Sequence, residues 1–246
     1  MKKRFGFTLA EVLITLGIIG VVAAMTIPTL IANTNSAKFR SQFKKSISTM
    51  NQAGLMAEAQ YDFNYGAAED ACTALSDIPA DSLKTFCAIM NGTLTGHTMT
   101  ETSPYEKAPS FKALPTATTG IPSPVYLSLA DGSMVVFSKA AKTTASDGSC
   151  TLPIGQTMTK AWIDKHTNCL GFIDVNGKTL PNTEVTCSEA GSASGSAANK
   201  AVLDPSAACK VANDTAHMTD IYPIVFHDAT VEPASDAAKA VLATAK

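Results

Sequence analysis

One carboxylate stands inside a long apolar segment near the start of the chain. Glu11 is the only charged residue between positions 7 and 37, and the 21 residues at positions 12–32 are almost all apolar. An ionised side chain near the centre of a bilayer costs about 3 kcal/mol, so Glu11 needs a cation partner there. The segment itself contains no lysine or arginine. The chemistry open to Glu11 is therefore ion pairing, and the partner has to come from elsewhere.

A cut between Gly6 and Phe7 would create this partner. The new α-amino group of Phe7 would lie one helical turn from Glu11, because residues i and i+4 share a helix face. The pair can form within one chain or between two chains, where it would supply attraction and axial register in lipid. We expect the interchain pair in a polymer, and the intrachain pair or a protonated Glu11 in the monomer.

The apolar segment is long enough to cross a membrane as a helix. At about 1.5 Å per residue, it reaches across a hydrocarbon core of roughly 30 Å. The cations at positions 2–4 favour a cytoplasmic N-terminus, with the rest of the chain across the membrane. A secretory signal is the alternative, because Ala23 and Ala24 imitate its cleavage site. Against it, the apolar run continues beyond Ala24, and ordinary signal cores exclude a charge such as Glu11.

A helical pattern continues after the apolar segment. Between positions 36 and 61, apolar residues recur at steps of three and four, namely Phe39, Phe43, Ile47, Met50, Ala53 and Ala57. Cations interleave with them at Lys38, Arg40, Lys44 and Lys45. These cations either line a solvated helix face or bind phospholipid head groups. The apolar face predicts an amphipathic helix that lies on a globular head.

Positions 8–61 together predict a rod of about 54 helical residues, roughly 80 Å long. Pro28 removes one backbone hydrogen bond, so we expect a bend or a melted turn there rather than an end. A monomeric globule has no use for this length, whereas rods packed side by side form the core of a helical polymer. The expected divisions are a leader (1–6), a transmembrane and polymerisation helix (7–33), an amphipathic continuation (34–62) and a globular head (63–246).

The head is expected to be α+β, with a small antiparallel sheet. Asp131-Gly132 supplies a positive-φ turn between two β-prone runs and predicts a hairpin. The expected strands are 125–129, 134–137, 171–175 and 222–226, in a sheet of three to five strands. Short helices are expected at 67–75, 81–90 and 234–245, and irregular or flexible segments at 91–124 and 188–199. Trp162 is expected to pack in the head core.

The cysteines all follow the apolar segment, at Cys72, Cys87, Cys150, Cys169, Cys187 and Cys209. Their even number and the compartment across the membrane favour disulfides. Six cysteines allow 15 pairings, among which we prefer neighbour pairing, although the sequence does not choose. A zinc site is the competing interpretation, but C-x-x-C is absent, and His166 with Cys169 forms an isolated H-x-x-C.

The sequence shows no catalytic constellation. His97, His166, His217 and His227 are scattered, and neither a G-x-S-x-G motif nor a phosphate-binding loop is present. We therefore expect surface or turn histidines, no enzyme and no cofactor. Asp174 and Asn176 form a weak calcium candidate, set against a plain Asn-Gly turn.

Removal of residues 1–6 leaves 16 basic and 21 acidic side chains, a formal net charge of −5. This balance offers no direct evidence for a nucleic-acid partner.

The residues from Gly6 through Phe7, Thr8, Leu9, Ala10 and Glu11, followed by an apolar helix with Pro28, resemble the N-terminus of type IV pilins and type II secretion pseudopilins. The runs at 125–137, 172–182 and 221–233 resemble, more weakly, the sheet elements of pilin heads. The resemblance implies that a prepilin peptidase cuts after Gly6 and methylates Phe7. It also implies that Glu11 pairs with the terminal amine of a neighbouring subunit, and that a membrane platform with an ATPase motor drives assembly.

The expected function is therefore that of a structural subunit, polymerised with itself and with other pilins or pseudopilins. It would first span the inner membrane once, in contact with lipid, and then enter an extracellular pilus or a periplasmic pseudopilus. The alternative is a minor pilin at a filament tip that binds DNA, a surface or a secreted substrate through the loops at 91–124 and 188–201. An unprocessed membrane-anchored enzyme is the remaining hypothesis.

Overall fold

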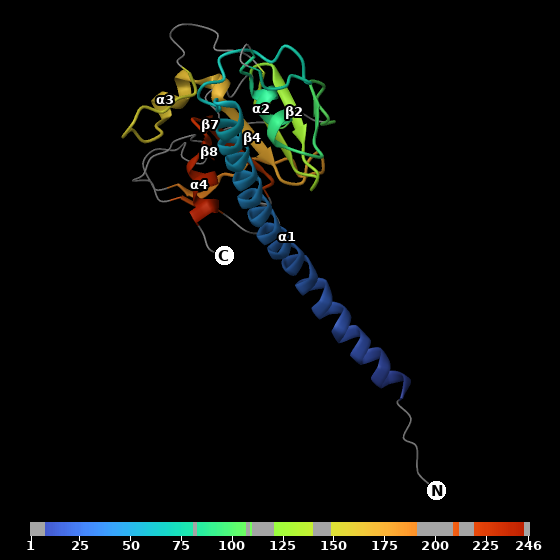
Figure 1. The fold of residues 1–246 in the computed structure, drawn as a ribbon. Helices are drawn as coiled ribbons and strands as arrows, with labels where there is room; N and C mark the ends of the chain where they lie inside the picture. Colours follow the sequence, from blue (N-terminus) through green and yellow to red (C-terminus); the bar gives the residue numbers. More distant parts are fainter. Residues whose placement is uncertain are drawn as a thin grey trace.

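The structure, a computed structural model, describes residues 8–80, 83–106, 109, 121–139, 149–190, 209–211 and 219–243. A single rod, α1, runs from the N-terminal end into a compact head (Figure 1). Helix α1 covers Leu9–Tyr61 and has 53 residues, which makes it about 80 Å long. The predicted rod is confirmed. The helix continues through Pro28 without a break, so the expected melted turn is wrong, because one missing hydrogen bond is too little to interrupt so long a ladder.

The second half of α1 packs on the head through the predicted face. All six apolar residues of that face are buried, with Phe43, Met50 and Ala57 fully inaccessible. The Phe43 ring stacks on Tyr222 with centroids 4.2 Å apart. The buried Tyr65 hydroxyl donates to the Met50 carbonyl at 2.7 Å. The rod is therefore part of the head's core.

The head is built on a six-stranded antiparallel sheet in the order β1-β2-β3-β4-β7-β8. The strands are β1 (Thr98–Thr100), β2 (Pro124–Ser128), β3 (Met134–Ser138), β4 (Leu170–Asp174), β7 (Ile221–His227) and β8 (Thr230–Pro233). The α+β class and the four predicted strands are confirmed, but the expected upper limit of five strands is wrong. The two strands that were missed, β1 and β8, are edge strands of three and four residues, too short to show an alternating pattern.

Helix α1 covers one edge of this sheet. The Val231 N–H on the outer side of β8 donates to the Asn51 side-chain carbonyl of α1. Gly54 lies against the Ala229 carbonyl at the β7–β8 turn, where a Cβ would collide with the backbone. Coverage of an edge strand prevents it from pairing with another chain. The helix–sheet contact is thus polar as well as apolar.

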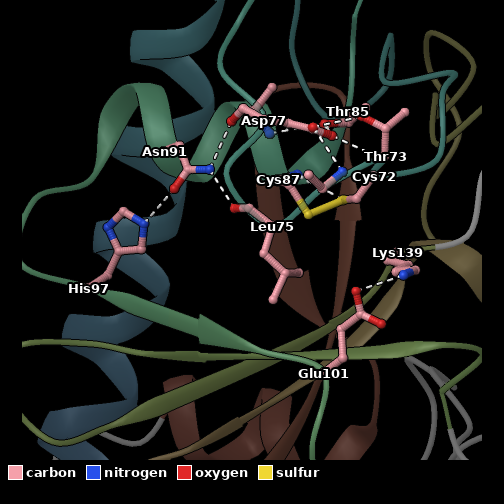
Figure 2. The surroundings of a disulfide bond; sticks show 12 residues. Cys72, Thr73, Leu75, Asp77, Thr85, Cys87, Asn91, His97, Glu101 and Lys139 are labelled. Atoms are coloured by element: carbon pink, nitrogen blue, oxygen red, sulfur yellow. Dashed lines mark hydrogen bonds and ion pairs between the residues drawn. A yellow bond between two sulfur atoms is a disulfide. The ribbon is translucent and has the colours of Figure 1, made fainter.

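Three short helices complete the described part of the head: α2 (Phe86–Thr93), α3 (Lys160–Lys165) and α4 (Asp236–Ala243), with a 3-10 turn η1 at Thr167–Cys169. The C-terminal helix is confirmed. The expected helix at 67–75 is wrong, because this segment consists of turns and irregular structure. Asp77 holds it in that form by accepting from the Thr73 N–H at 2.8 Å and the Ala74 N–H at 2.9 Å (Figure 2).

Two other boundaries also differ from the predictions. The helix expected from position 81 begins only at Phe86, because the Thr85 side chain accepts from the Ala88 N–H and caps the helix there. The segment expected to be flexible from position 188 starts as β5 (Cys187–Ala190), which pairs with β6 (Cys209–Val211) in a separate two-stranded sheet. Positions 191–199 of that segment lie outside the described residues.

Three disulfides join cysteines that are neighbours in the sequence: Cys72–Cys87, Cys150–Cys169 and Cys187–Cys209. The first ties the Asp77-supported turns to α2 (Figure 2). The second ties the chain before α3 to η1, and the third joins β5 to β6. Each bridge closes a loop of about 15 to 22 residues, which restricts the unfolded chain and so stabilises the head.

Candidate functional site: the stem of α1

The first half of α1, here called the stem (Leu9–Pro28), is apolar and uncovered. Among the described residues, it is the one helix that is long and apolar enough to span a membrane, with 20 residues. Its large side chains are 45–77% exposed, namely Leu9, Val12, Leu13, Ile14, Leu16, Ile18, Ile19, Val21, Val22, Met25 and Ile27. Such a surface is unfavourable in water and requires a lipid or protein environment. The stem is therefore the part of the molecule that is suited to contact lipid or another protein.

Glu11 takes part in the N-terminal cap of α1. Its Oε2 accepts from the Thr8 N–H and from the Thr8 hydroxyl, both at 2.8 Å, and the Thr8 hydroxyl accepts from the Glu11 N–H at 3.2 Å. This reciprocal arrangement is a capping box. Our sequence analysis missed it, although Thr8-x-x-Glu11 before an apolar run is its known signature. The cap draws the carboxylate toward the end of the helix that Phe7 precedes.

Gly6 and Phe7, the predicted cleavage residues, lie outside the described residues. Farther along the stem, Gly17 opens a shallow apolar groove between Ile14, Ile18, Val21 and Val22. No atom lies within 4 Å of a Cβ built on Gly17 or Gly20. Small residues of this kind allow two helices to approach closely in a membrane.

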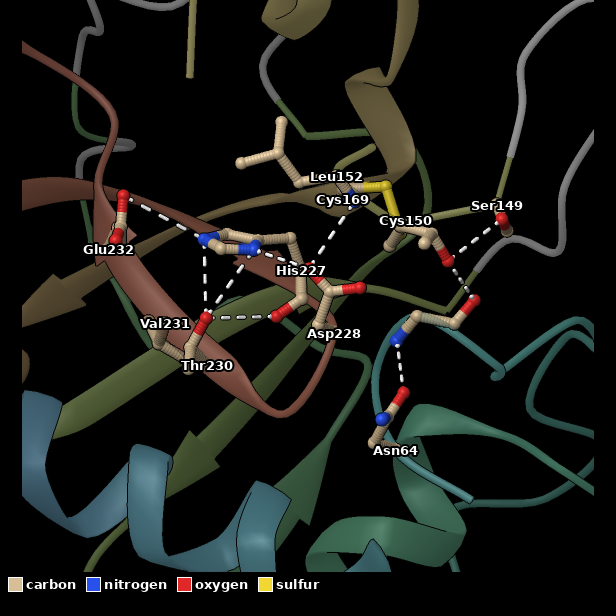
Figure 3. A network of polar contacts seen from close by, with 12 residues as sticks. Asn64, Ser149, Cys150, Leu152, Cys169, His227, Asp228, Thr230, Val231 and Glu232 are labelled. Carbon is tan, nitrogen blue, oxygen red and sulfur yellow. Dashed lines mark hydrogen bonds and ion pairs between the residues drawn. A yellow bond between two sulfur atoms is a disulfide. The ribbon is translucent and has the colours of Figure 1, made fainter. Parts of the chain in front are cut away.

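In the head, His227 is buried between two carboxylates (Figure 3). Its Nδ1 lies 3.0 Å from Asp228 Oδ2, and its Nε2 lies 3.7 Å from Glu232 Oε2. Burial lowers the pKa of His227, but the hydrogen bonds and charges of Glu232 and Asp228 outweigh it and raise the pKa above the ordinary value. His227 borders the β7–β8 turn, one of the two expected locations for the histidines, but it is a buried member of an ion-pair cluster rather than a surface residue.

Thr230 gives this cluster a superficial likeness to a catalytic triad. Its hydroxyl lies 3.4 Å from Nδ1 and 3.2 Å from Nε2 of His227. An oxygen nearly equidistant from both ring nitrogens is in line with neither lone pair, so it cannot pass its proton efficiently. The same hydroxyl donates to the His227 carbonyl at 3.1 Å. The Thr230 hydroxyl therefore stabilises the β7–β8 turn and is not positioned as a nucleophile.

A second buried polar group lies where β4 ends and β7 begins. Asp174 and Asp220 are completely inaccessible. Asp174 accepts from the Tyr105 hydroxyl at 2.8 Å and from the Asn176 N–H at 3.2 Å. Burial, opposed by the Tyr105 hydrogen bond and assisted by the Asp220 charge, raises the pKa of Asp174 to about 7.

These contacts bear on the calcium candidate, Asp174 with Asn176. Both carboxylate oxygens of Asp174 are already engaged within the head, and Asn176 Oδ1 is buried without a hydrogen-bond partner in the structure. Among the described residues, no group of three or more His, Cys, Asp or Glu side chains could hold a metal ion. Calcium binding at this pair stays a prediction.

The other candidates are separate from one another. Trp162 is half-buried, packs against the core and stacks on His166 with ring centroids 4.0 Å apart, so the expectation that it packs in the head core is confirmed at the edge of that core. His97 lies 3.0 Å from Asn91 Oδ1, and His217 lies outside the described residues. The loops proposed to bind a ligand, 91–124 and 188–201, fall partly outside them as well, and their described portions include the end of α2 and the strand β1.

The contribution of His227 to stability is expected to appear in the pH dependence of the unfolding free energy. Because its pKa is raised by folding, its contribution is complete below the unfolded value of about 6.5 and is lost as the pH rises through the folded value. His227→Gln should therefore flatten the fall of the unfolding free energy on the alkaline side, as measured by urea unfolding. His166→Gln, at a histidine outside the cluster, is the matched variant for comparison. An unchanged slope in His227→Gln would contradict the assignment.

Asp174 is expected to act in the same direction. With a folded pKa of about 7 against about 3.8 in the unfolded chain, its contribution is full below pH 3.8 and disappears as the pH rises through 7. Asp174→Asn should be more stable relative to the wild type at pH 8 than at pH 5 in the same assay. Added Ca²⁺ tests the calcium prediction: a rise in the unfolding free energy of the wild type at pH 8, absent in Asp174→Asn, would support it, and no rise would reject it.

Comparison with known proteins adds one finding to this geometry. Residues 1–27 match the family model described as the prokaryotic N-terminal methylation motif. The comparisons with curated proteins and with solved structures found no match. The motif belongs to a family of structural proteins and implies processing by a prepilin peptidase and pilin-type assembly in general. This chain therefore carries a type IV pilin-like prepilin signal, followed by an apolar helix suited to a membrane anchor.

Proposed function

We propose that this chain is a structural subunit of a type IV pilus or of a type II secretion pseudopilus. The observation that carries the proposal is the uncovered stem, which continues without interruption into a helix that the head buries. One rod thus offers an apolar surface at a fixed distance from a folded head. In a bilayer this surface meets lipid, and in a filament it meets the stems of neighbouring subunits, so the same residues serve both states.

In this proposal, the N-terminus is made by proteolysis. A prepilin peptidase cuts between Gly6 and Phe7 and methylates the new amine of Phe7. Glu11 of one subunit then pairs with the amine of its neighbour, for which the carboxylate must leave, or share, its contacts with Thr8. The pair would supply axial register, because apolar stems alone slide against one another at little cost. Pro28 sits at the end of the stem and belongs to the same assembly surface.

The head lies across the inner membrane before assembly, since cations precede the stem. Extraction of the stem from lipid costs free energy, which a membrane platform and its cytoplasmic ATPase motor supply. The product is an extracellular pilus or a periplasmic pseudopilus of many identical subunits, with other pilins or pseudopilins as neighbours. The chain's part in this process is structural.

Mass spectrometry of the native protein tests the processing step. We expect a mature chain that begins at Phe7, with one added methyl group of about 14 Da. A chain that begins at Met1 would contradict the proposal, and so would one that begins after Ala24 with most of the stem removed. Reduction and alkylation of the same sample would show whether the six cysteines are oxidised.

Replacement of Glu11 tests the assembly step. Glu11→Gln removes the charge and keeps the shape, so insertion into the membrane should be unchanged or improved. Filament yield should fall at least about tenfold, the equivalent of about 1.4 kcal/mol in one contact. Glu58→Gln makes the same change on the same helix, at a residue that accepts a hydrogen bond from Asn64, and should assemble normally. Normal filaments from Glu11→Gln, counted by electron microscopy after equal membrane insertion, would rule out the ion pair.

A further inference from the structure

The point where the stem meets the head carries a concentration of positive charge. Phe39 is the first buried residue of α1 among its described side chains. The four cations of α1 lie within one residue before and six residues after it, at Lys38, Arg40, Lys44 and Lys45. The helix has no acidic residue between positions 12 and 57. This cluster therefore forms a collar at the level where the rod enters the head.

Two turns of the sheet lie at the same level. Lys45 Nζ lies 2.8 Å from Asp131 Oδ2 in the β2–β3 turn. That turn touches the one that follows β4, because a Cβ on Gly177 would lie 2.7 Å from the Gly132 carbonyl oxygen. We call the collar and these two turns the base of the head. In Figure 1 this part of the head is the side from which α1 emerges.

The second turn adds a cation and an apolar side chain to the base. Lys178 is exposed, and Leu180 is 75% exposed. A large apolar residue beside a lysine at the surface suits a membrane interface, where the apolar group enters the head-group layer and the amine meets phosphate.

The acidic residues of the base do not cancel this charge at its surface. Asp131 is bound by Lys45 and by the Ser133 hydroxyl at 2.6 Å. Although partial burial acts in the opposite direction, these hydrogen bonds lower the pKa of Asp131, so it stays ionised and committed to Lys45. Asp174, Asp220 and Glu184, the other described acids near these turns, are buried. Lys38 and Lys178 therefore present exposed positive charge at the base.

The collar lies close to the membrane that the stem enters. Lys38 follows Pro28 by ten residues, or about 15 Å along the rod. A head-group layer extends roughly 5–7 Å beyond the hydrocarbon core, so the Lys38 backbone is about 8–10 Å from its outer edge. The extended Lys38 side chain brings its amine closer to the head groups. The remaining distance is shorter than the Debye length of about 10 Å, so the amine and the anionic head groups attract each other.

We propose that the base of the head binds the anionic head groups of the membrane that α1 enters, with Lys38 nearest to phosphate and a tilt of the rod bringing Lys178 and Leu180 to the interface. This contact holds the head on the bilayer while the subunit waits for assembly. It rests on the proposed function only in requiring that the stem be inserted in a membrane. Assembly would have to break the contact, so it sets part of the cost of extraction.

The experiment uses the full chain in lipid nanodiscs of phosphatidylcholine, with or without roughly a third of phosphatidylglycerol. Leu180→Trp in a Trp162→Phe background provides the only tryptophan of this chain, and energy transfer to a dansyl group on a lipid head, measured against discs without the chain, reports its distance from the membrane. If Leu180→Trp fails to fold, as judged by circular dichroism and intact disulfides, Thr179→Trp in the same exposed turn replaces it.

We expect greater energy transfer in the anionic discs than in the neutral ones, and a decrease when salt rises from about 0.1 to 1 M. Lys38→Gln combined with Lys178→Gln should weaken docking about 25-fold, at about 5-fold for each cation. Lys165→Gln is the matched control, because Lys165 is an exposed lysine on α3, away from the emerging rod in Figure 1. It should leave the transfer unchanged.

Equal transfer in the two kinds of disc would overturn the proposal, and so would an equal loss in Lys165→Gln and in the double variant. Co-elution of the chain with the discs is measured in the same samples. A chain that fails to enter either disc counts against the membrane anchor and hence the proposed function. A chain that enters both discs without any dependence on anionic lipid counts against head docking alone.

Discussion

One continuous helix has to satisfy two different surroundings, and the rest of the structure depends on how it does so. Past Phe39, one face of α1 is buried in its own head, whereas before Pro28 the apolar side chains of the helix have no cover from the described chain. A helix transmits this difference rigidly, because each residue is joined to the next turn by backbone hydrogen bonds. The orientation of the head is therefore coupled to that of the stem. A force applied to the stem is therefore transmitted to the head through α1.

The second half of α1 is part of the hydrophobic core of the head. The apolar face of α1 packs on the sheet, with Phe43 stacked on Tyr222. The polar contact from Val231 to Asn51 satisfies an edge strand that would otherwise be free to pair with another chain. Removal of α1 would expose both the core and the edge of β8. This explains why a helix with an apolar stem is retained as part of a folded domain rather than attached to it by a linker.

Buried polar groups are placed where the sheet turns and ends. His227 with its two carboxylates locks the β7–β8 turn, and Asp174 with Tyr105 lies at the end of β4. Both groups have pKa values raised by folding, so both make the head more stable in mild acid than in alkali. Three disulfides hold the less regular segments around this frame. Polar contacts and disulfides thus stabilise the turns, the strand ends and the less regular segments, where hydrophobic packing contributes least.

Local features of the sequence determined much of this protein. The rod, its buried face, the Asp131-Gly132 hairpin and the strands at β4 and β7 follow from periodicity and turn chemistry, which act between residues close in the chain. The prepilin signal at residues 1–27 is likewise a local pattern, and the Thr8–Glu11 cap was readable in the same way.

Only the tertiary structure decided the edge strands, the absence of a helix at 67–75 and the burial of His227, Asp174 and Asp220. A three-residue strand has no period to detect, and the segment 67–75 is held in part by a distant strand end, since the Cys72 N–H donates to the Lys139 carbonyl at 3.1 Å. From sequence alone, a histidine or an aspartate is predicted to lie at the surface. Its burial and its hydrogen-bond partners depend on segments that are distant in the chain. The physical reason is that burial and long-range pairing depend on which segments come together, and no window of neighbouring residues contains that information.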